Sequence, residues 1–538
     1  MQMGMLPISD NDTWGGSCVP LEVEQTLRPD IKGQEEGIPN AVQTARVGVG
    51  SRLAAWNRKI ESLAGLEARG ISRVLPEEKH AGGAAGYVQM FAMWSGISLS
   101  AVNLVIGFLG PQVFQLGRID CVCITIFANA LGCCGPAYMA TFGPRSGHRS
   151  MILARYFMGY WPAKLACLLH VLMQIGWGVV GAVVAGQFEY GGRIIHACAD
   201  SVLTECHSAR VVISAVDGSG LSIAVGCVVA ALCIGGLATF GIAVLHVYER
   251  YAAFPQLFAI LALIGSSGRD WNTSLMSTGD AATITANRCS FFALMFSAII
   301  GLAAVSADFY VCYATTTSRP LTFLATWAGN WASITFADLV GIGIATGIAT
   351  NSAWTEAYSI SSGMLLKASL EGLGGFGDFC LVIFALGSIN NIAPTTYVAA
   401  LSVQTLGRFP KMVPRWIWSI LVMFVELACA VAGRNKLSVI FGNFLPMMAC
   451  WFHIWRGKTY DWTIWEDKKK LPLGAAAMLA WLVGWAGAIV GMAQVYYAGP
   501  LALEIGGFGG DVGGWLSIAF ADLVYPPLRY LELQKLKR

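Results

Sequence analysis

Charged residues are scarce in this chain. Only 12% of its 538 residues are Asp, Glu, Lys or Arg, which is about half the share of an ordinary soluble domain. Hydrophobic residues make up 55%, and the mean hydropathy is +0.59. This balance excludes an ordinary soluble domain. The net charge of +3 is also too small to indicate a nucleic-acid partner.

Three kinds of pattern are missing. The 7 histidines and 15 cysteines show no metal-ligand spacing, so we expect neither a bound metal nor another cofactor. His170, His246 and His453 are too scattered to form the His/Asp or Cys/His group that a membrane enzyme needs. No short apolar core follows a basic start, so we also expect no cleaved signal peptide.

The chain instead contains a long series of apolar stretches. A helix of about 20 apolar residues crosses the hydrocarbon core of a bilayer, and segments in lipid must pair their backbone polar groups internally. The sequence therefore predicts an all-α polytopic membrane protein with about 12 transmembrane helices. The predicted spans are 91–115, 120–142, 164–188, 220–243, 253–267, 289–312, 320–349, 377–405, 415–433, 437–455, 473–497 and 511–526.

Basic residues indicate the orientation of these spans. Most of the 35 Lys and Arg residues fall in segments on one side, which the positive-inside rule assigns to the cytosol. We therefore expect a multi-pass protein of the plasma membrane, surrounded by lipid, with both termini cytoplasmic. Residues 1–90 carry Pro, Gly and charges throughout and are predicted to be a largely disordered cytoplasmic tail. Residues 527–538 form a second, short cytoplasmic tail.

Two features fall in loops that this orientation places outside. Asn272 begins an Asn-Thr-Ser sequon and is a candidate glycosylation site. Cys198 and Cys206 lie in the loop 189–215 and are candidates for a disulfide, although two free thiols in a variable loop give the same pattern.

The first and sixth spans each contain a run of small residues. Ser98 and Ser100 belong to such a run, which allows local unwinding and offers oxygens to a solute or cation; close helix packing gives the same pattern. In span six a similar run ends at Asp308, the candidate group for proton coupling. Breaks five spans apart match two five-helix repeats, at about 91–267 and 289–456, followed by peripheral helices at 473–526.

Span eight carries the densest polar cluster. Asn390 and Asn391 supply donors and acceptors that suit the amide-like edges of a heterocycle. Pro394, followed by Thr395, removes one backbone hydrogen bond and frees a carbonyl about one turn earlier. A structural kink with amides bonded to neighbouring helices is the alternative. Trp177 in span three is able to stack on a planar ring, or to serve only in packing.

Taken together, many segments resemble the fungal purine–cytosine permeases of the nucleobase–cation symporter family. The resemblance covers roughly residues 66–532. It is carried by LEARGISRV at 66–74, PEE at 76–78, GFLGP at 107–111, TFGPR at 141–145, GW at 176–177 with Gln187, HVYERY at 246–251 with Pro255, ADF at 307–309, NIAPTTY at 391–397, YDW at 460–462, LPLG at 471–474, GP at 499–500, GD at 510–511 and YPPLR at 525–529.

This resemblance implies a proton-coupled importer with the 5+5 inverted-repeat core of LeuT-type transporters plus two peripheral helices. It places a small heterocyclic substrate between spans one, three, six and eight. By the same match Trp177 stacks on the base, Asn391 hydrogen-bonds it, and Ser98 and Ser100 line the break in span one.

The chain also departs from the family pattern. Gly181 stands where relatives usually have an amide one turn after the tryptophan, Leu302 replaces an aromatic residue, and Ile392 and Ser98 replace asparagines. Each lost hydrogen bond to a polar base costs about 1–3 kcal/mol, so we expect a roomier and less polar pocket.

Import of nucleobases such as cytosine and purines by alternating access is therefore the main hypothesis. A vitamin B6-like compound or another small planar heterocycle is the alternative cargo. A membrane enzyme, a receptor or a channel is a more distant alternative. The sequence favours H+ as the co-transported ion but leaves Na+ open, because Ser and Thr oxygens in spans one and eight are able to coordinate it.

Overall fold

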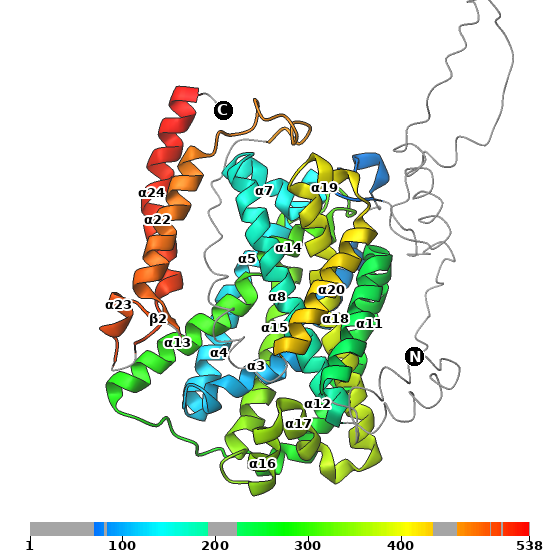
Figure 1. Cartoon of the computed structure of the whole chain (residues 1–538), viewed down its shortest axis with the longest axis vertical. Coiled ribbons are helices and arrows are strands. Elements are labelled where there is room, and N and C mark those ends of the chain that lie inside the picture. The colour runs from blue at the N-terminus through cyan, green and yellow to red at the C-terminus, as the bar shows by residue number, and fades with distance from the viewer. Residues whose placement is uncertain are drawn as a thin grey trace, which may run out of the picture.

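The computed structural model describes residues 69–79, 83–191, 223–433, 460–494, 497–506 and 509–536. Within these ranges nearly all regular structure is helical, and the long helices form a bundle (Figure 1). Six of the described helices are long and apolar enough to cross a membrane, or up to eight if each of two bent pairs is one span. The predicted multi-pass membrane protein is confirmed, whereas the span expected at 437–455 lies outside the described residues.

The first five spans follow in sequence order. They comprise α2 (Ala84–Ser98) with α3 (Ala101–Gln112), α4 (Arg118–Gly132) with α5 (Cys134–Ala140), α8 (Pro162–Gly191), α11 (Ile223–Phe240) and α12 (Ile242–Ser267). The short helices α6 (Gly143–Ser146) and α7 (Ser150–Met158) connect spans two and three. Two helices begin earlier than the hydropathy pattern indicates. Span one starts at Ala84, and span five starts at Ile242 because Gly241, with φ +104°, separates α11 from α12 within one residue.

The next group begins with a helix of span six, α13 (Ala281–Ile300), after the 3₁₀ turn η4 (Gly268–Asp270). The other elements are α14 (Ala303–Ser306), η5 (Ala307–Tyr310), α15 (Arg319–Gly347), α16 (Ser352–Ile360), α17 (Ser362–Leu370), η6 (Glu371–Leu373), α18 (Gly375–Thr405), α19 (Arg408–Met412) and α20 (Arg415–Gly433). The helices α16 and α17 lie at the end of the molecule opposite α7 and α19 (Figure 1).

Two C-terminal helices stand apart from this bundle. α22 (Ala475–Gly491) and α24 (Gly513–Leu536) pack along each other on one flank (Figure 1). The pair β1 (Ala493–Gln494) and β2 (Tyr497–Ala498) and the short α23 (Pro500–Leu503) connect them. Tyr525 on α24 donates a hydrogen bond to the Phe157 carbonyl at 3.1 Å, which ties this peripheral pair to α7.

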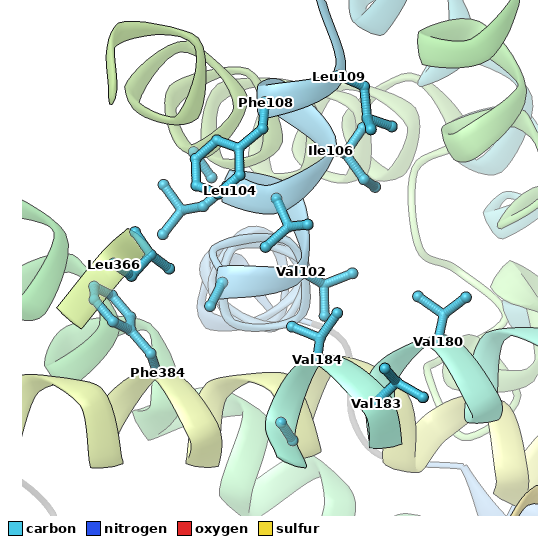
Figure 2. Close-up of a cluster of buried hydrophobic side chains, with 14 of the residues drawn as sticks. Val102, Leu104, Ile106, Phe108, Leu109, Val180, Val183, Val184, Leu366 and Phe384 are labelled. Carbon is cyan, nitrogen blue, oxygen red and sulfur yellow. The ribbon is translucent and has the colours of Figure 1, made fainter. Parts of the chain in front are cut away.

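The largest apolar cluster fills the centre of the bundle. Leu99, between α2 and α3, and residues of α3, α8 and α18 belong to it. In Figure 2 side chains from α3, α8, α17 and α18 point toward a common centre: Val102, Leu104, Ile106, Phe108, Leu109, Val180, Val183, Val184, Leu366 and Phe384. This packing holds α3, the second half of span one, against spans three and eight.

The segment just before span one is also packed against the bundle, although the composition predicts a disordered tail there. Arg69 and Glu78 form a 2.7 Å ion pair, and the guanidinium hydrogen bond holds the pKa of the Glu78 carboxyl below its ordinary value. The Val74 N–H donates to the Gly147 carbonyl at 2.9 Å in the loop between α6 and α7. The segment 69–79, with its short helix η3 (Pro76–Glu78), therefore rests on this loop.

Candidate substrate site at the broken first span

Span one is broken where the sequence predicts it. Leu99 and Ser100 separate α2 from α3, and the two helices are bent by 56°. The Ser98 hydroxyl donates to the side-chain oxygen of Asn330 on α15 at 2.5 Å, whereas the buried Ser100 hydroxyl has no partner among the described residues. A helix break leaves backbone carbonyls unpaired, so side chains on other helices must satisfy them.

The asparagines of span eight supply this compensation. Asn390 Nδ2 donates to the Gly96 carbonyl at 2.9 Å, and Asn391 Nδ2 donates to the Ile97 carbonyl at 2.6 Å. Asn390 is fully buried, but Asn391 is half-buried. The two amides therefore fasten the tip of α2 to α18, and Asn391 is the more accessible of the two.

The next turn of α18 contains the predicted proline. Pro394 lies inside the helix, and the Thr395 hydroxyl donates to the Ile392 carbonyl at 2.7 Å. The Thr396 hydroxyl donates to Glu426 Oε2 on α20 at 2.8 Å. Both threonine hydroxyls are thus held in fixed positions, one within the helix and one toward α20.

Span three places the predicted aromatic residue against the same region. Trp177 on α8 is buried, at 8% exposure, and belongs to the apolar cluster that contains Leu99 and Ile392. Gly181, one turn further along α8, lies directly against Ile392, because an added β-carbon there would be 2.0 Å from Ile392 Cγ1. This cluster therefore joins Trp177 of α8 to the break after α2 and to the part of α18 that carries the two asparagines.

Span six is interrupted at Gly301 and Leu302, where α13 ends and α14 begins, and it tightens into η5. The interruption is milder than in span one, since residues 281–310 count as a single span. Leu302 packs on an apolar cluster that includes Trp94 and Ile97 of α2 and Ala393 of α18. Span six therefore completes the wall around the tip of α2.

Asp308 lies at the far end of span six, in η5, and contacts the start of α7. Its carboxylate accepts a hydrogen bond from the Ser150 N–H, and its carbonyl accepts one from the Arg149 guanidinium at 3.0 Å. Asp308 thus joins span six to the connection between spans two and three. Within the described part of the chain, no hydrogen bond links Asp308 to Asn391 or Ser98.

The candidates for glycosylation and for a disulfide are predicted in loops, and the structure describes only the first of them. Asn272 is half-buried after η4, and its side-chain oxygen accepts hydrogen bonds from the Ser274 N–H and hydroxyl at 3.0 and 2.9 Å. Cys198 and Cys206 lie outside the described residues. Asn330 is the site residue that the sequence interpretation missed; a lone amide in the apolar span seven was the available signal.

Comparison with known proteins shows similarity in sequence and in fold. The chain is 31% identical to the vitamin B6 transporter TPN1 of Saccharomyces cerevisiae, over 90% of each protein. It is 30% identical to the purine-cytosine permease fcyB of Emericella nidulans, over 88% of this chain and 91% of that one. Searched against family models, the chain matches none.

Among solved structures, the chain resembles Mhp1, a nucleobase-cation-symport-1 family transporter in a closed conformation with bromovinylhydantoin bound. The TM-score is 0.52 at 12% sequence identity, and the match covers 87% of this chain and 96% of Mhp1.

Proposed function

Because this chain belongs to the purine–cytosine permease group of the nucleobase–cation symporter family, we propose that it imports nucleobases together with a cation. Its fold is that of the LeuT-type transporters, as predicted, and it is a transporter rather than an enzyme. In this fold the solute binds near the middle of the bilayer, where helices are interrupted, and the repeats move around it.

One observation carries the proposal most directly. The half-buried Asn391 donates to the Ile97 carbonyl at the tip of α2, and Trp177 belongs to the same apolar cluster as Leu99 at the break and Ile392 beside Asn391. An indole face and a carboxamide are the groups that recognise a flat, polar ring, through stacking and through paired donors and acceptors. In this proposal Ser98, Ser100, Asn390, Pro394 and Thr395 line the remainder of the site.

We propose H+ as the coupling ion. The amide hydrogens of Asn390 and Asn391 point at the carbonyls of Gly96 and Ile97, and these positive dipole ends disfavour a metal cation there. The Thr395 hydroxyl is also engaged within α18. Asp308 is the sequence-based candidate for the coupling group, and the pH dependence of uptake by Asp308→Asn tests it.

The plasma membrane and cytoplasmic termini remain part of the proposal. α7, α19 and the C-terminal end of α24 lie at one end of the bundle (Figure 1). The buried Arg149 and Arg155 belong to this end, in agreement with a cytoplasmic face rich in basic residues.

A yeast strain lacking its own base permeases tests this function. Uptake of radiolabelled cytosine, adenine and hypoxanthine is measured at two external pH values, and we expect faster uptake at the lower pH. Trp177→Ala and Asn391→Ala, checked for delivery to the cell surface, are expected to lose most of it. Trp485→Ala removes an indole from the peripheral α22 and serves as the matched control. Absence of pH-dependent uptake of any base contradicts the proposal.

A vitamin B6-like cargo is the second candidate, because of the Gly181–Ile392 contact. It puts an apolar side chain beside Trp177 where the family resemblance leads us to expect amides, and this suits a less polar heterocycle. The 31% identity to TPN1 agrees with it. Competition of labelled cytosine uptake by unlabelled pyridoxine, and the reverse experiment, separates the two cargoes.

A further inference from the structure

Glu249 is an acid that neither the predicted site nor the sequence pattern assigns to any role. It lies in α12 with 0% of its surface exposed, and neither of its carboxylate oxygens has a hydrogen-bond partner in the described structure. The other buried acids of these helices differ. Asp338 accepts from Asn129 at 2.7 Å, and Glu426 accepts from Thr396 at 2.8 Å.

An ionised carboxylate is unstable in such a place. Burying a charge without a counter-ion or hydrogen-bond donors carries a large desolvation cost, and protonation removes that cost. No ion pair to Glu249 is formed by any described residue. The side chain therefore carries a proton in this conformation.

The elements packed against α12 supply no cation to Glu249. Titratable side chains on those elements are Tyr87 on α2, Cys227 and Cys233 on α11, Asp378, Cys380 and Tyr397 on α18, Arg319 and Asp338 on α15, Lys367 on α17, Glu371 on η6, and Arg269 and Asp270 on η4. The Tyr87 hydroxyl accepts a hydrogen bond from the Ser318 N–H. Lys367, Glu371 and Asp378 line a pocket at the N-terminal end of α18. The phenol of Tyr310 on η5 lies within electrostatic range of Glu249, but no hydrogen bond joins the two.

Tyr310 is itself hydrogen-bonded to span one and to α15. The Trp94 indole N–H donates to the Tyr310 hydroxyl at 2.7 Å, and that hydroxyl lies 2.6 Å from the Thr326 hydroxyl on α15. Glu249 thus adjoins a polar chain that links α2, η5 and α15.

Glu249 also touches the tip of α2 directly. An added β-carbon on Gly96 would lie 2.1 Å from the Glu249 carbonyl oxygen, so the two backbones are in close contact. The carbonyl of the same Gly96 accepts the Asn390 amide, and the neighbouring Ile97 carbonyl accepts the Asn391 amide. One short stretch of α2 therefore lies between Glu249 and the candidate substrate site.

We propose that Glu249 is the binding site of the co-transported proton, and that the Gly96–Ile97 stretch couples it to the substrate. The inference rests on the proposed function. When α2 packs on α12, the carboxyl is sealed from water and keeps its proton. When α2 moves away from α12, water reaches the carboxyl, its O–H bond breaks, and the proton leaves to that water. A solute that engages Asn391 alters the contact holding Ile97 and hence the position of α2.

Purified protein in liposomes tests this role. Wild type and Glu249→Gln are compared in two assays with labelled cytosine and labelled pyridoxine: accumulation driven by a pH gradient, and exchange against internal unlabelled solute without a gradient. For one proton per solute, a gradient of one pH unit drives up to about tenfold accumulation. Glu249→Gln is expected to lose accumulation and to keep exchange. Asp338→Asn, another buried acid changed to its amide, is expected to keep both.

The outcomes separate the alternatives. Accumulation by Glu249→Gln that follows pH as in wild type overturns the assignment. If Glu249→Gln loses both activities, Glu249→Asp decides, because a displaced carboxyl must shift the pH profile of transport; an unchanged profile overturns the assignment. If Asp308→Asn alone separates exchange from accumulation, Asp308 is the proton site instead. A wild type that transports neither solute refutes the proposed function, and the role of Glu249 falls with it.

Discussion

The side chain of Ile392 on α18 occupies the space that a β-carbon on Gly181 of α8 would need, with Cγ1 only 2.0 Å and Cδ1 only 2.7 Å from that position. These are two of the positions at which the chain departs from the family pattern. These two departures are therefore one local exchange: a glycine and a branched apolar side chain pack together in the cluster that contains Trp177, in place of two polar groups.

This contact predicts coupled effects on stability. Gly181→Ala overpacks the interface and is expected to lower the free energy of unfolding by about 1–3 kcal/mol. Ile392→Ala leaves a cavity and is expected to cost about 2 kcal/mol or more. Because the smaller side chain removes the clash, the double variant is expected to be more stable than the sum of the single effects predicts. Thermal unfolding of the detergent-purified proteins measures all three.

Gly236→Ala on α11 is the matched control, since a β-carbon there meets no other atom within 4 Å. It is expected to be neutral or slightly stabilising, because alanine favours a helix over glycine by up to about 1 kcal/mol. Strictly additive effects of the Gly181 and Ile392 substitutions contradict the packing seen here.

The same pair predicts a change in cargo. Ile392→Asn restores a hydrogen-bonding group beside the candidate site, and Gly181 leaves room for it. A regained hydrogen bond to a polar base is worth about 1–3 kcal/mol, so the ratio of cytosine to pyridoxine uptake is expected to rise about tenfold. Competition curves for both solutes, measured in cells, provide this ratio. Ile392→Val, which keeps the apolar character, is expected to leave the ratio unchanged.

The adjacent asparagines predict two different phenotypes. Asn390 is fully buried and holds the Gly96 carbonyl, so Asn390→Ala is expected to lower thermal stability by about 1–3 kcal/mol with or without solute. Asn391 is half-buried, so Asn391→Ala is expected mainly to raise the KM of uptake. Thermal shifts with and without ligand, together with uptake kinetics, distinguish the two. Equal losses of stability and equal kinetics in the two variants contradict separate roles.

Much of this architecture is predictable from composition and spacing. Long apolar runs predict the helices, because lipid leaves no other backbone structure, and the small residues around Ser98 predict the break in span one. The resemblance to the permeases adds the fold and the function class, which the comparisons confirm. The roles of individual polar side chains are not predictable in this way.

Those roles depend on contacts between distant parts of the chain. Asn390 bonds a carbonyl 294 residues away, and nothing local distinguishes it from Asn391. Glu249 lies in the polar run 246–251, which hydropathy assigns to a loop; burial against Gly96 becomes visible only when α12 packs on α2. Likewise, the sequence places Gly181 and Ile392 on separate spans without indicating that they touch.

A last prediction concerns His148, in the loop between α6 and α7. Burial, the largest cause, lowers the pKa of its imidazole from 6.5 to about 4, and Nε2 lies 2.7 Å from the Trp462 carbonyl. A carbonyl only accepts, so the neutral ring donates from Nε2. Between about pH 4 and about pH 6.5 the unfolded chain binds this proton and the folded protein does not. The stability that depends on neutral His148 is therefore complete above about pH 6.5 and is lost as the pH falls toward 4.

His148→Gln keeps a donor for the Trp462 carbonyl but does not titrate. The melting temperature of wild type is expected to fall between neutral and acidic pH more steeply than that of the variant, by an amount corresponding to about 3 kcal/mol at most. Thermal unfolding over this pH range measures the difference between the two slopes. Because His148 stays neutral at cytosolic pH, its substitution is also expected to leave the pH dependence of uptake intact. Parallel melting curves for the two proteins at every pH would show that burial of His148 does not contribute to the acid sensitivity of the fold.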